Sequence, residues 1–478
     1  MTSTTKNQLR ILQGCCRNLA RTSKINQSIG EHTRMNHTSR TQPSNPLRAI
    51  ALRVQVGVAV LAAVTAAGCS SSSNSPAAQE PSSSPAMSTA APAPAPAAPV
   101  AAHGVEATVN DVPWSKVGPG WTLATWSPVI AHRPGEERAP GEPDPETAAT
   151  TLYLVDPAGN RYAISTFSGA DVRLDLTDWS GDGTHALFES TGNPWVISID
   201  LHTGEQTRIA IPVRSYPRYT RPDGNALLVS TNDTSDEPGT LTRIDLAGNE
   251  QQSYPTEDLG GAGQFSGRYL ASTDGTQLVL GTANLGNELV PRRDDSLVVM
   301  GNDGRIIRTL PTPMPNGDCA PMRWWTPTVV LASCSAEHGS AHQLWKIPID
   351  GGAPTALTAV NSGQGDDPGF DGSLGEGLAW ELPSGTFLQS AGACGTAFLS
   401  RLTPDGRTTR VKVPGMSQSV FVTGATADKL ILEGHMDCGG GTALVSYDPA
   451  ANTSTVLLGP LVNGGGVTEA ILFPEARP

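Results

Sequence analysis

The sequence lacks the short motifs that mark several common classes of enzyme. It contains no G-x-S-x-G nucleophile elbow, no H-E-x-x-H zinc pair, no G-x-x-x-x-G-K-[ST] phosphate loop and no C-x-x-C-H haem site. The serine hydrolases, zinc proteases, P-loop proteins and c-type haem proteins that these signatures define are therefore excluded. Sites assembled from residues scattered along the chain are not excluded by these absences.

Basic residues are scarce over most of the chain. Residues 69–478 contain 23 Lys and Arg against 44 Asp and Glu, a net charge of −21, whereas residues 1–68 contain 9 basic residues and 1 acidic residue. A surface with such an excess of negative charge repels phosphate backbones and anionic lipid headgroups. Nucleic acid is therefore not an expected partner, and the protein surface itself is not expected to attract a membrane.

The sequence also lacks an apolar run long enough to cross a bilayer. Its longest mostly apolar stretch, residues 54–67, has 14 residues and follows Arg48 and Arg53. A membrane-spanning helix needs about 20 residues. A short apolar run after basic residues and before small residues is typical of an export signal. Residues 1–68 are therefore predicted to be a signal peptide region. Within it, residues 1–34 are interpreted as an over-long gene assignment, because Met35 is the more usual kind of start.

The stretch AAGC at residues 66–69 resembles the lipobox of bacterial lipoproteins. That resemblance implies that Cys69 receives a diacylglycerol and an acyl chain such as palmitate, and becomes the first residue after cleavage. Ala66 departs from the leucine that the family prefers at this position. Two or more acyl chains anchor a protein stably to a membrane. The alternative is an ordinary secretory signal in which Cys69 has no role.

Residues 69–112 are predicted to form a linker. Most of this segment consists of Ser, Pro and Ala, as in APAPAPAAP at residues 91–99, and has no residues that form a core. Such a composition favours a disordered, partly polyproline II spacer. The folded domain is therefore expected over residues 113–478.

From residue 113 onward the chain repeats a pattern of four short strands. The clearest copy spans residues 171–212, where apolar residues alternate with polar ones between turns such as DWSGDG at residues 178–183. Further copies follow with a period of about 40–50 residues, which is typical of the blades of a β-propeller. The repeat therefore predicts an all-β propeller.

The two ends of the repeat supply the parts of one more blade. Residues 120–128, 151–160 and 161–167 have the patterns of second, third and fourth strands, and residues 466–474 form a spare strand at the other end. Pairing the spare strand with the first blade closes the ring and removes an open sheet edge. This predicts seven blades, with a ring of six or eight as the alternative.

The segment WSGDGTHALF at residues 179–188 resembles the WSPDGKxIAF unit of TolB-like propellers, which are built from WD40-like repeats. One good copy and several degraded copies, within residues 113–474, carry the resemblance. It implies the propeller architecture but says little about function, because one fold hosts many activities.

Four cysteines follow Cys69, and an even number in an exported chain favours disulfides. Cys319 and Cys334 lie at the ends of a predicted hairpin, where opposed residues come within bridging distance. Cys394 and Cys438 each follow the second strand of neighbouring blades and could link them. Metal ligation is the alternative, although no pair has the C-x₂₋₄-C spacing of zinc sites.

Two groups of aspartates are weak candidates for a calcium site. Asp178 and Asp182 flank a strand turn, and Asp366, Asp367 and Asp371 lie in a loop between the fifth and sixth blades. Aspartates in turns usually accept hydrogen bonds from their own backbone, and an acidic loop is usually solvated. No cofactor is therefore expected, calcium is the candidate that these residues leave open, and no residue is assigned a catalytic role.

The innermost strands are expected to bring few ionisable residues to the centre of the ring, because they include VRLDL, RYLAS and GLAWEL. This favours a non-enzymatic binding or scaffolding lipoprotein on the outer face of the bacterial cytoplasmic membrane, with a protein or glycan of the cell envelope as partner. The alternative is an extracytoplasmic hydrolase, lyase or lactonase-like enzyme with a metal or polar site in the central channel. Carboxylates or histidines that converge from several inner strands would favour the enzyme.

Overall fold

The computed structural model describes residues 100–101, 104–130, 132, 136–168, 174–190, 192–234, 237–283, 296–314, 317–336, 341–362, 376–392, 396–417, 419–435, 441–459 and 465–474. Strands account for the regular structure in these ranges, apart from two short 3-10 helices, η3 (Val109–Asp111) and η4 (Trp114–Lys116). Within the same ranges, no helix is long and apolar enough to span a membrane.

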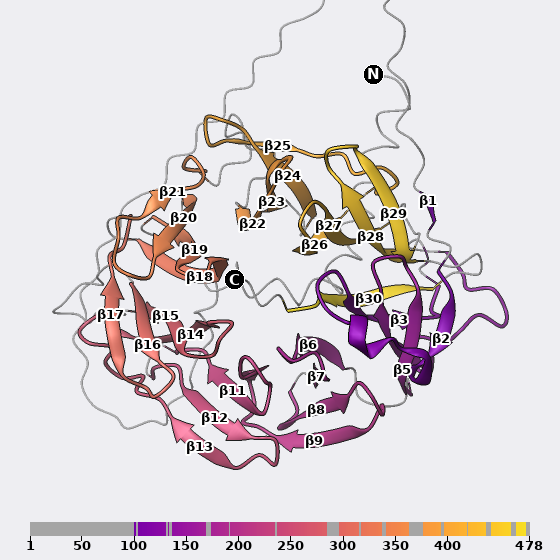
Figure 1. Cartoon of the computed structure of the whole chain (residues 1–478), viewed down its shortest axis with the longest axis horizontal. Helices are drawn as coiled ribbons and strands as arrows, with labels where there is room; N and C mark the ends of the chain where they lie inside the picture. The colour runs from indigo at the N-terminus through magenta and orange to yellow at the C-terminus, as the bar shows by residue number, and fades with distance from the viewer. Residues whose placement is uncertain are drawn as a thin grey trace, which may run out of the picture. The chain divides into compact units, whose positions relative to one another are not determined.

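Seven β-sheets surround one axis and form the blades of a propeller (Figure 1). This confirms the predicted fold class and the predicted number of blades. Blades 2 to 6 each contain four antiparallel strands in chain order, from the innermost to the outermost. Each strand forms where apolar and polar side chains alternate, and the strands are separated by turns that contain Gly, Asp or Asn.

The strand bounds of these five blades are as follows. Blade 2 contains β6 (Asp175–Trp179), β7 (His185–Glu189), β8 (Trp195–Asp200) and β9 (Gln206–Ala210). Blade 3 contains β10 (Ser215–Tyr219), β11 (Ala226–Thr231), β12 (Leu241–Asp245) and β13 (Glu250–Ser253). Blade 4 contains β14 (Gln264–Ala271), β15 (Gln277–Ala283), β16 (Leu297–Gly301) and β17 (Ile306–Leu310). Blade 5 contains β18 (Asp318–Thr326), β19 (Val329–Ser335), β20 (His342–Pro348) and β21 (Thr355–Ala356). Blade 6 contains β22 (Glu376–Leu382), β23 (Gly385–Ala391), β24 (Ala397–Leu402) and β25 (Thr408–Arg410).

Blade 1 joins strands from both ends of the described chain. Its order is β2 (Glu106–Thr108), β5 (Arg161–Phe167), β4 (Thr150–Val155), β3 (Thr122–Ser127) and β30 (Gly466–Leu472). The last strand of the chain, β30, is therefore the innermost strand of the first blade. It runs antiparallel to β3, with Thr125 opposite Glu469. This confirms the predicted closure by the C-terminal strand.

Two short strands were not apparent from the sequence, and both lie within residues 69–112. In blade 7, β1 (Val100–Ala101) is added in parallel to the outer edge of the sheet formed by β26 (Val420–Ala425), β27 (Leu430–His435), β28 (Thr442–Asp448) and β29 (Thr453–Leu458). In blade 1, β2 is likewise parallel to β5. The chain thus covers the outer edges of blades 7 and 1 with its own backbone, which removes exposed hydrogen-bonding groups there.

Neighbouring blades pack face to face through apolar layers. Between blades 1 and 2, Trp179 and Phe188 are fully buried, and the Trp179 ring meets Phe473 edge-on, with centroids 4.9 Å apart. Gly183 supports this contact because its φ is +78° and a Cβ there would lie 2.6 Å from the Phe473 ring. The W-S-x-D-G unit therefore places an aromatic ring between blades and keeps its turn free of side-chain bulk.

Candidate functional site

Four carboxyl side chains from three neighbouring blades lie close together beside the inner ring of strands. Asp175 begins β6 and stands directly opposite Glu189 on β7, both in blade 2. Glu469 on β30 of blade 1 interacts with Asp175 and also with Glu433 on β27 of blade 7. These four residues are called the carboxyl cluster below. Closure of the ring brings them together, because β30 lies between blade 7 and blade 2 (Figure 1).

Glu469 occupies the centre of the carboxyl cluster. Its carboxyl group accepts a hydrogen bond from the backbone N–H of Leu176 and is hydrogen-bonded to the side chain of Asp175. Two carboxyl groups can share a hydrogen bond only when one of them carries a proton. Burial, followed by the negative charge of Asp175, raises the pKa of Glu469 well above its usual value. The contact therefore retains a proton at a pH where an exposed glutamate is ionised.

Glu433 and Glu189 also hold protons more tightly than exposed glutamates do. Burial raises the pKa of Glu433 to about 8, although its side chain keeps part of its surface exposed. Burial likewise raises the pKa of Glu189, while the positive charge of Arg218 opposes this rise. Near neutral pH, the cluster therefore contains both proton donors and proton acceptors.

Blade 3 brings the basic side chain of Arg218 to the cluster, where it acts on Glu189, and an aromatic side chain shares its face of β10. Arg218 and Tyr216 alternate along β10 and are both exposed, Tyr216 by 39%. The Tyr216 hydroxyl accepts a hydrogen bond of 3.1 Å from the side-chain amide of Asn232, and Arg218 donates 2.9 Å to the carbonyl of Pro217. The arrangement offers a ligand an aromatic face, a cation and protonated carboxyl groups on rigid strands.

Two members of the carboxyl cluster, Asp175 and Glu469, stand on innermost strands. Asp175 belongs to the VRLDL segment, but Glu469 comes from the closing strand and Glu433 from a second strand. The spare strand at residues 466–474, which was expected to complete the first blade, contains Glu469. Nothing in the local sequence around Glu433 indicates that it approaches blade 1.

The two described aspartates of the proposed calcium sites serve structural networks. Asp178 is buried, with one carboxylate oxygen 2.9 Å from Arg221 and the other accepting 2.8 Å from the N–H of Tyr219. Asp182 accepts hydrogen bonds from the hydroxyl of Ser180 at 2.6 Å and from the N–H of Thr184 at 3.0 Å. These contacts are those expected of an inter-blade ion pair and an aspartate turn.

The remaining predicted aspartates, Asp366, Asp367 and Asp371, lie outside the described residues. Among the residues that are described, no group of three or more His, Cys, Asp and Glu side chains is placed to hold a metal ion. Cys69, Cys394 and Cys438 are also outside the described ranges, so their predicted lipidation and pairing stay predictions.

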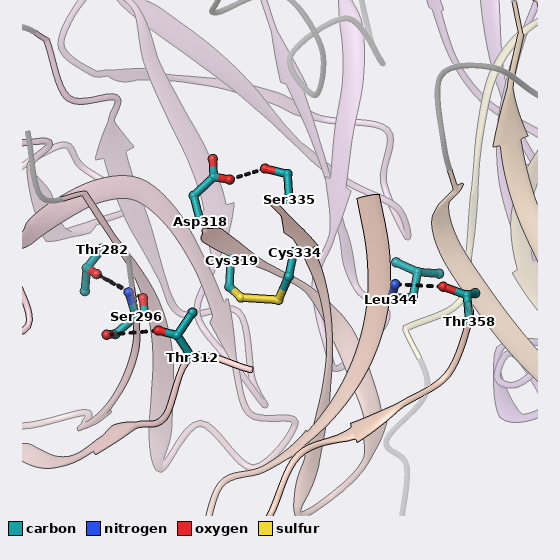
Figure 2. The surroundings of a disulfide bond; sticks show 9 residues. All are labelled: Thr282, Ser296, Thr312, Asp318, Cys319, Cys334, Ser335, Leu344 and Thr358. Atoms are coloured by element: carbon teal, nitrogen blue, oxygen red, sulfur yellow. Dashed lines mark hydrogen bonds between the residues drawn. A yellow bond between two sulfur atoms is a disulfide. The ribbon is translucent and has the colours of Figure 1, made fainter. Parts of the chain in front are cut away.

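The predicted Cys319–Cys334 disulfide is present between β18 and β19 of blade 5 (Figure 2). The two cysteines are directly opposed in the antiparallel ladder, with Cα atoms 4.1 Å apart, and both are buried. At the adjacent pair, the hydroxyl of Ser335 donates to the carboxylate of Asp318. The hairpin pattern was therefore sufficient to identify this bridge from the sequence.

A second polar row crosses the same end of blade 5. Ser335 stands opposite Asp318 on one side and opposite His342 on the other, so the three side chains share one face of the sheet. Burial lowers the pKa of His342, and the charge of Asp318 opposes this effect. Because the Ser335 hydroxyl donates to Asp318, the histidine does not stand between the serine and the acid as in a hydrolase triad.

Comparisons with known proteins find distant structural likenesses. No family model and no curated protein matches the chain. Similar solved structures include the β-propeller domain of the Trilobed protease from Pyrococcus furiosus, with 11% identity over 71% of this chain and 95% of that one and a TM-score of 0.44. Oligogalacturonate lyase from Vibrio parahaemolyticus has 12% identity over 70% and 100%, with a TM-score of 0.42. A putative TolB from Agrobacterium tumefaciens has 12% identity over 61% and 88%, with a TM-score of 0.35. The chain thus has a distant structural similarity to TolB-like and related propellers.

Proposed function

We propose that this protein is a non-enzymatic binding or scaffolding module, held by a lipid anchor at Cys69 on the outer face of the bacterial cytoplasmic membrane. Its partner is a protein or glycan of the cell envelope, bound at the end of the ring that carries the carboxyl cluster. The observation that carries this proposal is the exposed pair of Tyr216 and Arg218 on β10, where Arg218 acts on Glu189 of the carboxyl cluster.

The side chains at this end suit a polar ligand. Protonated carboxyl groups donate hydrogen bonds, ionised ones accept them, and Arg218 supplies a fixed positive charge. The exposed ring of Tyr216 offers a flat apolar surface with a polar tip, which suits both sugars and peptide side chains. Because these groups stand on strands rather than on loops, little ordering is needed on binding.

Site-specific crosslinking in envelope membranes tests this assignment. A photo-reactive amino acid at Tyr216 is expected to give a discrete adduct, and the same amino acid at Asp350 is expected to give none. Asp350 is the matched control because it is exposed in the turn between β20 and β21, at the opposite end of the strands. Loss of the adduct in Arg218→Ala supports direct contact at this site. Equal labelling from both positions, or an adduct that is indifferent to Arg218, overturns the proposal.

The lipid anchor has its own test. Cys69→Ser is expected to move the protein from the detergent phase to the aqueous phase in a phase-partition assay and to abolish incorporation of labelled palmitate. Cys319→Ser is the control, because that cysteine forms a disulfide and its loss leaves the anchor intact. A Cys69→Ser protein that still partitions into detergent contradicts the lipoprotein assignment.

One observation favours the alternative of an extracytoplasmic enzyme with a polar site at the centre of the ring. Asp175 and Glu469 share a proton beside Glu433, whose pKa is about 8, and general acid–base chemistry needs such a combination near neutral pH. Turnover of a glycosidic or lactone substrate that disappears in Glu433→Gln would favour this alternative. Stoichiometric calcium or zinc in the purified protein would favour its metal-dependent form.

A further inference from the structure

The side chain of Glu469 connects blade 1 with blade 2 near the axis, whereas a hydrogen bond of 3.1 Å from the Gln206 amide to the Ser165 hydroxyl connects their outer strands. Its strand, β30, is held to blade 1 by backbone pairing with β3. Its carboxyl group points away from that pairing and reaches blade 2, where it contacts Leu176 N–H and the Asp175 side chain. Leu176 and Glu469 are separated by 293 residues, so the contact exists only when the ring is closed.

The protonation of this contact determines whether it attracts or repels. A protonated Glu469 can donate to the Asp175 carboxylate while it accepts from Leu176. An ionised Glu469 faces Asp175 as a like charge, and two adjacent carboxylates in a buried site repel each other. The loss of one proton therefore replaces the hydrogen bond between Glu469 and Asp175 with a repulsion between two carboxylates, at the point where the ring closes.

The charged groups around Glu469 reinforce this dependence. Asp175 faces it from β6 and Glu433 from β27, while Glu189 stands opposite Asp175. Basic groups on the surrounding strands are Arg218 on β10, which acts on Glu189, and His435, which follows Glu433 on the same face of β27. Two further strands packed against β30, β3 and β26, have no ionisable side chains. The carboxylate of Asp448, at the end of β28, is bonded to the turn N–H groups of Ala450 and Ala451.

We infer that Glu469 is a proton-dependent latch, which holds the closing strand β30 to blade 2 when protonated and releases it when ionised. The inference concerns the closure of the ring and does not depend on the proposed binding function. The latch is closed at low pH, and it opens as the pH rises through the raised pKa of Glu469. Its opening leaves β30 held by the β3 ladder and by buried residues such as Val467 and Leu472.

Hydrogen–deuterium exchange of the full chain measures the latch directly. After correction for intrinsic exchange rates, the protection of amides in Gly466–Leu472 is expected to fall between pH 5 and pH 9, by about tenfold for each pH unit above the pKa of Glu469. Amides of β23, in blade 6, are expected to lose less protection over the same range, because they report only the change in global stability. In Glu469→Gln the side chain accepts from Leu176 and donates to Asp175 at every pH, so the protection of β30 should stay constant.

Two controls make the result decisive. Glu381→Gln makes the same chemical change at an exposed position of inner strand β22, and should behave as the wild type does. If Glu469→Gln does not fold, a second variant serves as the test. It carries A124C and A470C, which can form a disulfide because Ala124 on β3 is opposed to Ala470 on β30. That disulfide should abolish the pH dependence of β30 protection with Glu469 unchanged. Protection in the wild type that is independent of pH, or pH dependence that persists in Glu469→Gln or the disulfide variant, overturns the inference.

Discussion

The guanidinium group of Arg221 lies 2.9 Å from the carboxylate of Asp178, and this ion pair joins blade 3 to blade 2. The same carboxylate accepts 2.8 Å from the N–H of Tyr219, so Asp178 fixes both a side chain and the backbone of the neighbouring blade. A buried aspartate in this position acts as a structural clamp between blades.

Removal of the Asp178 carboxylate is expected to be strongly destabilising. Asp178→Ala leaves Arg221 and the Tyr219 N–H without their partner in a buried site, which costs about 3–5 kcal/mol in free energy of unfolding. Chemical denaturation monitored by tryptophan fluorescence measures the change. Asp350→Ala, in an exposed turn, is the control and should change stability by less than about 0.5 kcal/mol. Equal effects of the two substitutions would contradict the clamp.

The disulfide of blade 5 is expected to contribute to stability in an oxidising compartment. The bridge joins residues that are 15 apart in sequence, and closing a loop of that length is worth about 3 kcal/mol in the chain-entropy model. Cys319→Ala/Cys334→Ala should therefore lower the denaturation midpoint. A reductant should reproduce the loss in the wild type and have no effect on the double variant. A denaturation midpoint that changes with neither the double substitution nor the reductant would show that the disulfide does not contribute to stability.

The turn at Gly183 is expected to reject a side chain. A φ of +78° strains any residue with a Cβ, and here that Cβ would also lie 2.6 Å from the Phe473 ring. Gly183→Ala should cost about 2 kcal/mol or more, from backbone strain and displaced packing together. The control is Gly192→Ala, since Gly192 has a φ of +84° but open space around its Cβ position. The difference in free energy of unfolding between the two variants measures the cost of displacing the Phe473 ring. No difference would mean that this ring moves aside without cost.

Glu433 should make the protein less stable as the pH rises. Its pKa in the folded protein is about 8, above the value of about 4.3 for an exposed glutamate. Between these values the folded state binds more protons than the unfolded state, so the free energy of unfolding falls with increasing pH. Glu433→Gln should therefore match the wild type near pH 4 and exceed its melting temperature near pH 8. A variant that is less stable than the wild type at pH 8 would show that the ionised carboxylate is favourable.

The repeated strand pattern was sufficient to predict the ring. The carboxyl cluster could not be predicted from any single segment, because its residues come from different blades. Alternating apolar residues and aspartate–glycine turns recur in each blade, and the unmatched strand at residues 466–474 indicated how the ring closes. The Cys319–Cys334 pair followed from a single hairpin. By contrast, Glu433, Glu469 and Asp175 meet because blades 7, 1 and 2 are neighbours, and each residue alone looks like an ordinary strand carboxylate.

The short parallel strands β1 and β2 also determine how the ring bears tension. Because Val100–Ala101 runs along β29 and Glu106–Thr108 along β5, a pull on the N-terminal side of the chain reaches the outer edges of blades 7 and 1 first. These few backbone hydrogen bonds are expected to break before any force reaches the pairing of β3 with β30, where the ring closes. Under a pull from that side, the chain would therefore lose β1 and β2 before the pairing of β3 with β30 breaks.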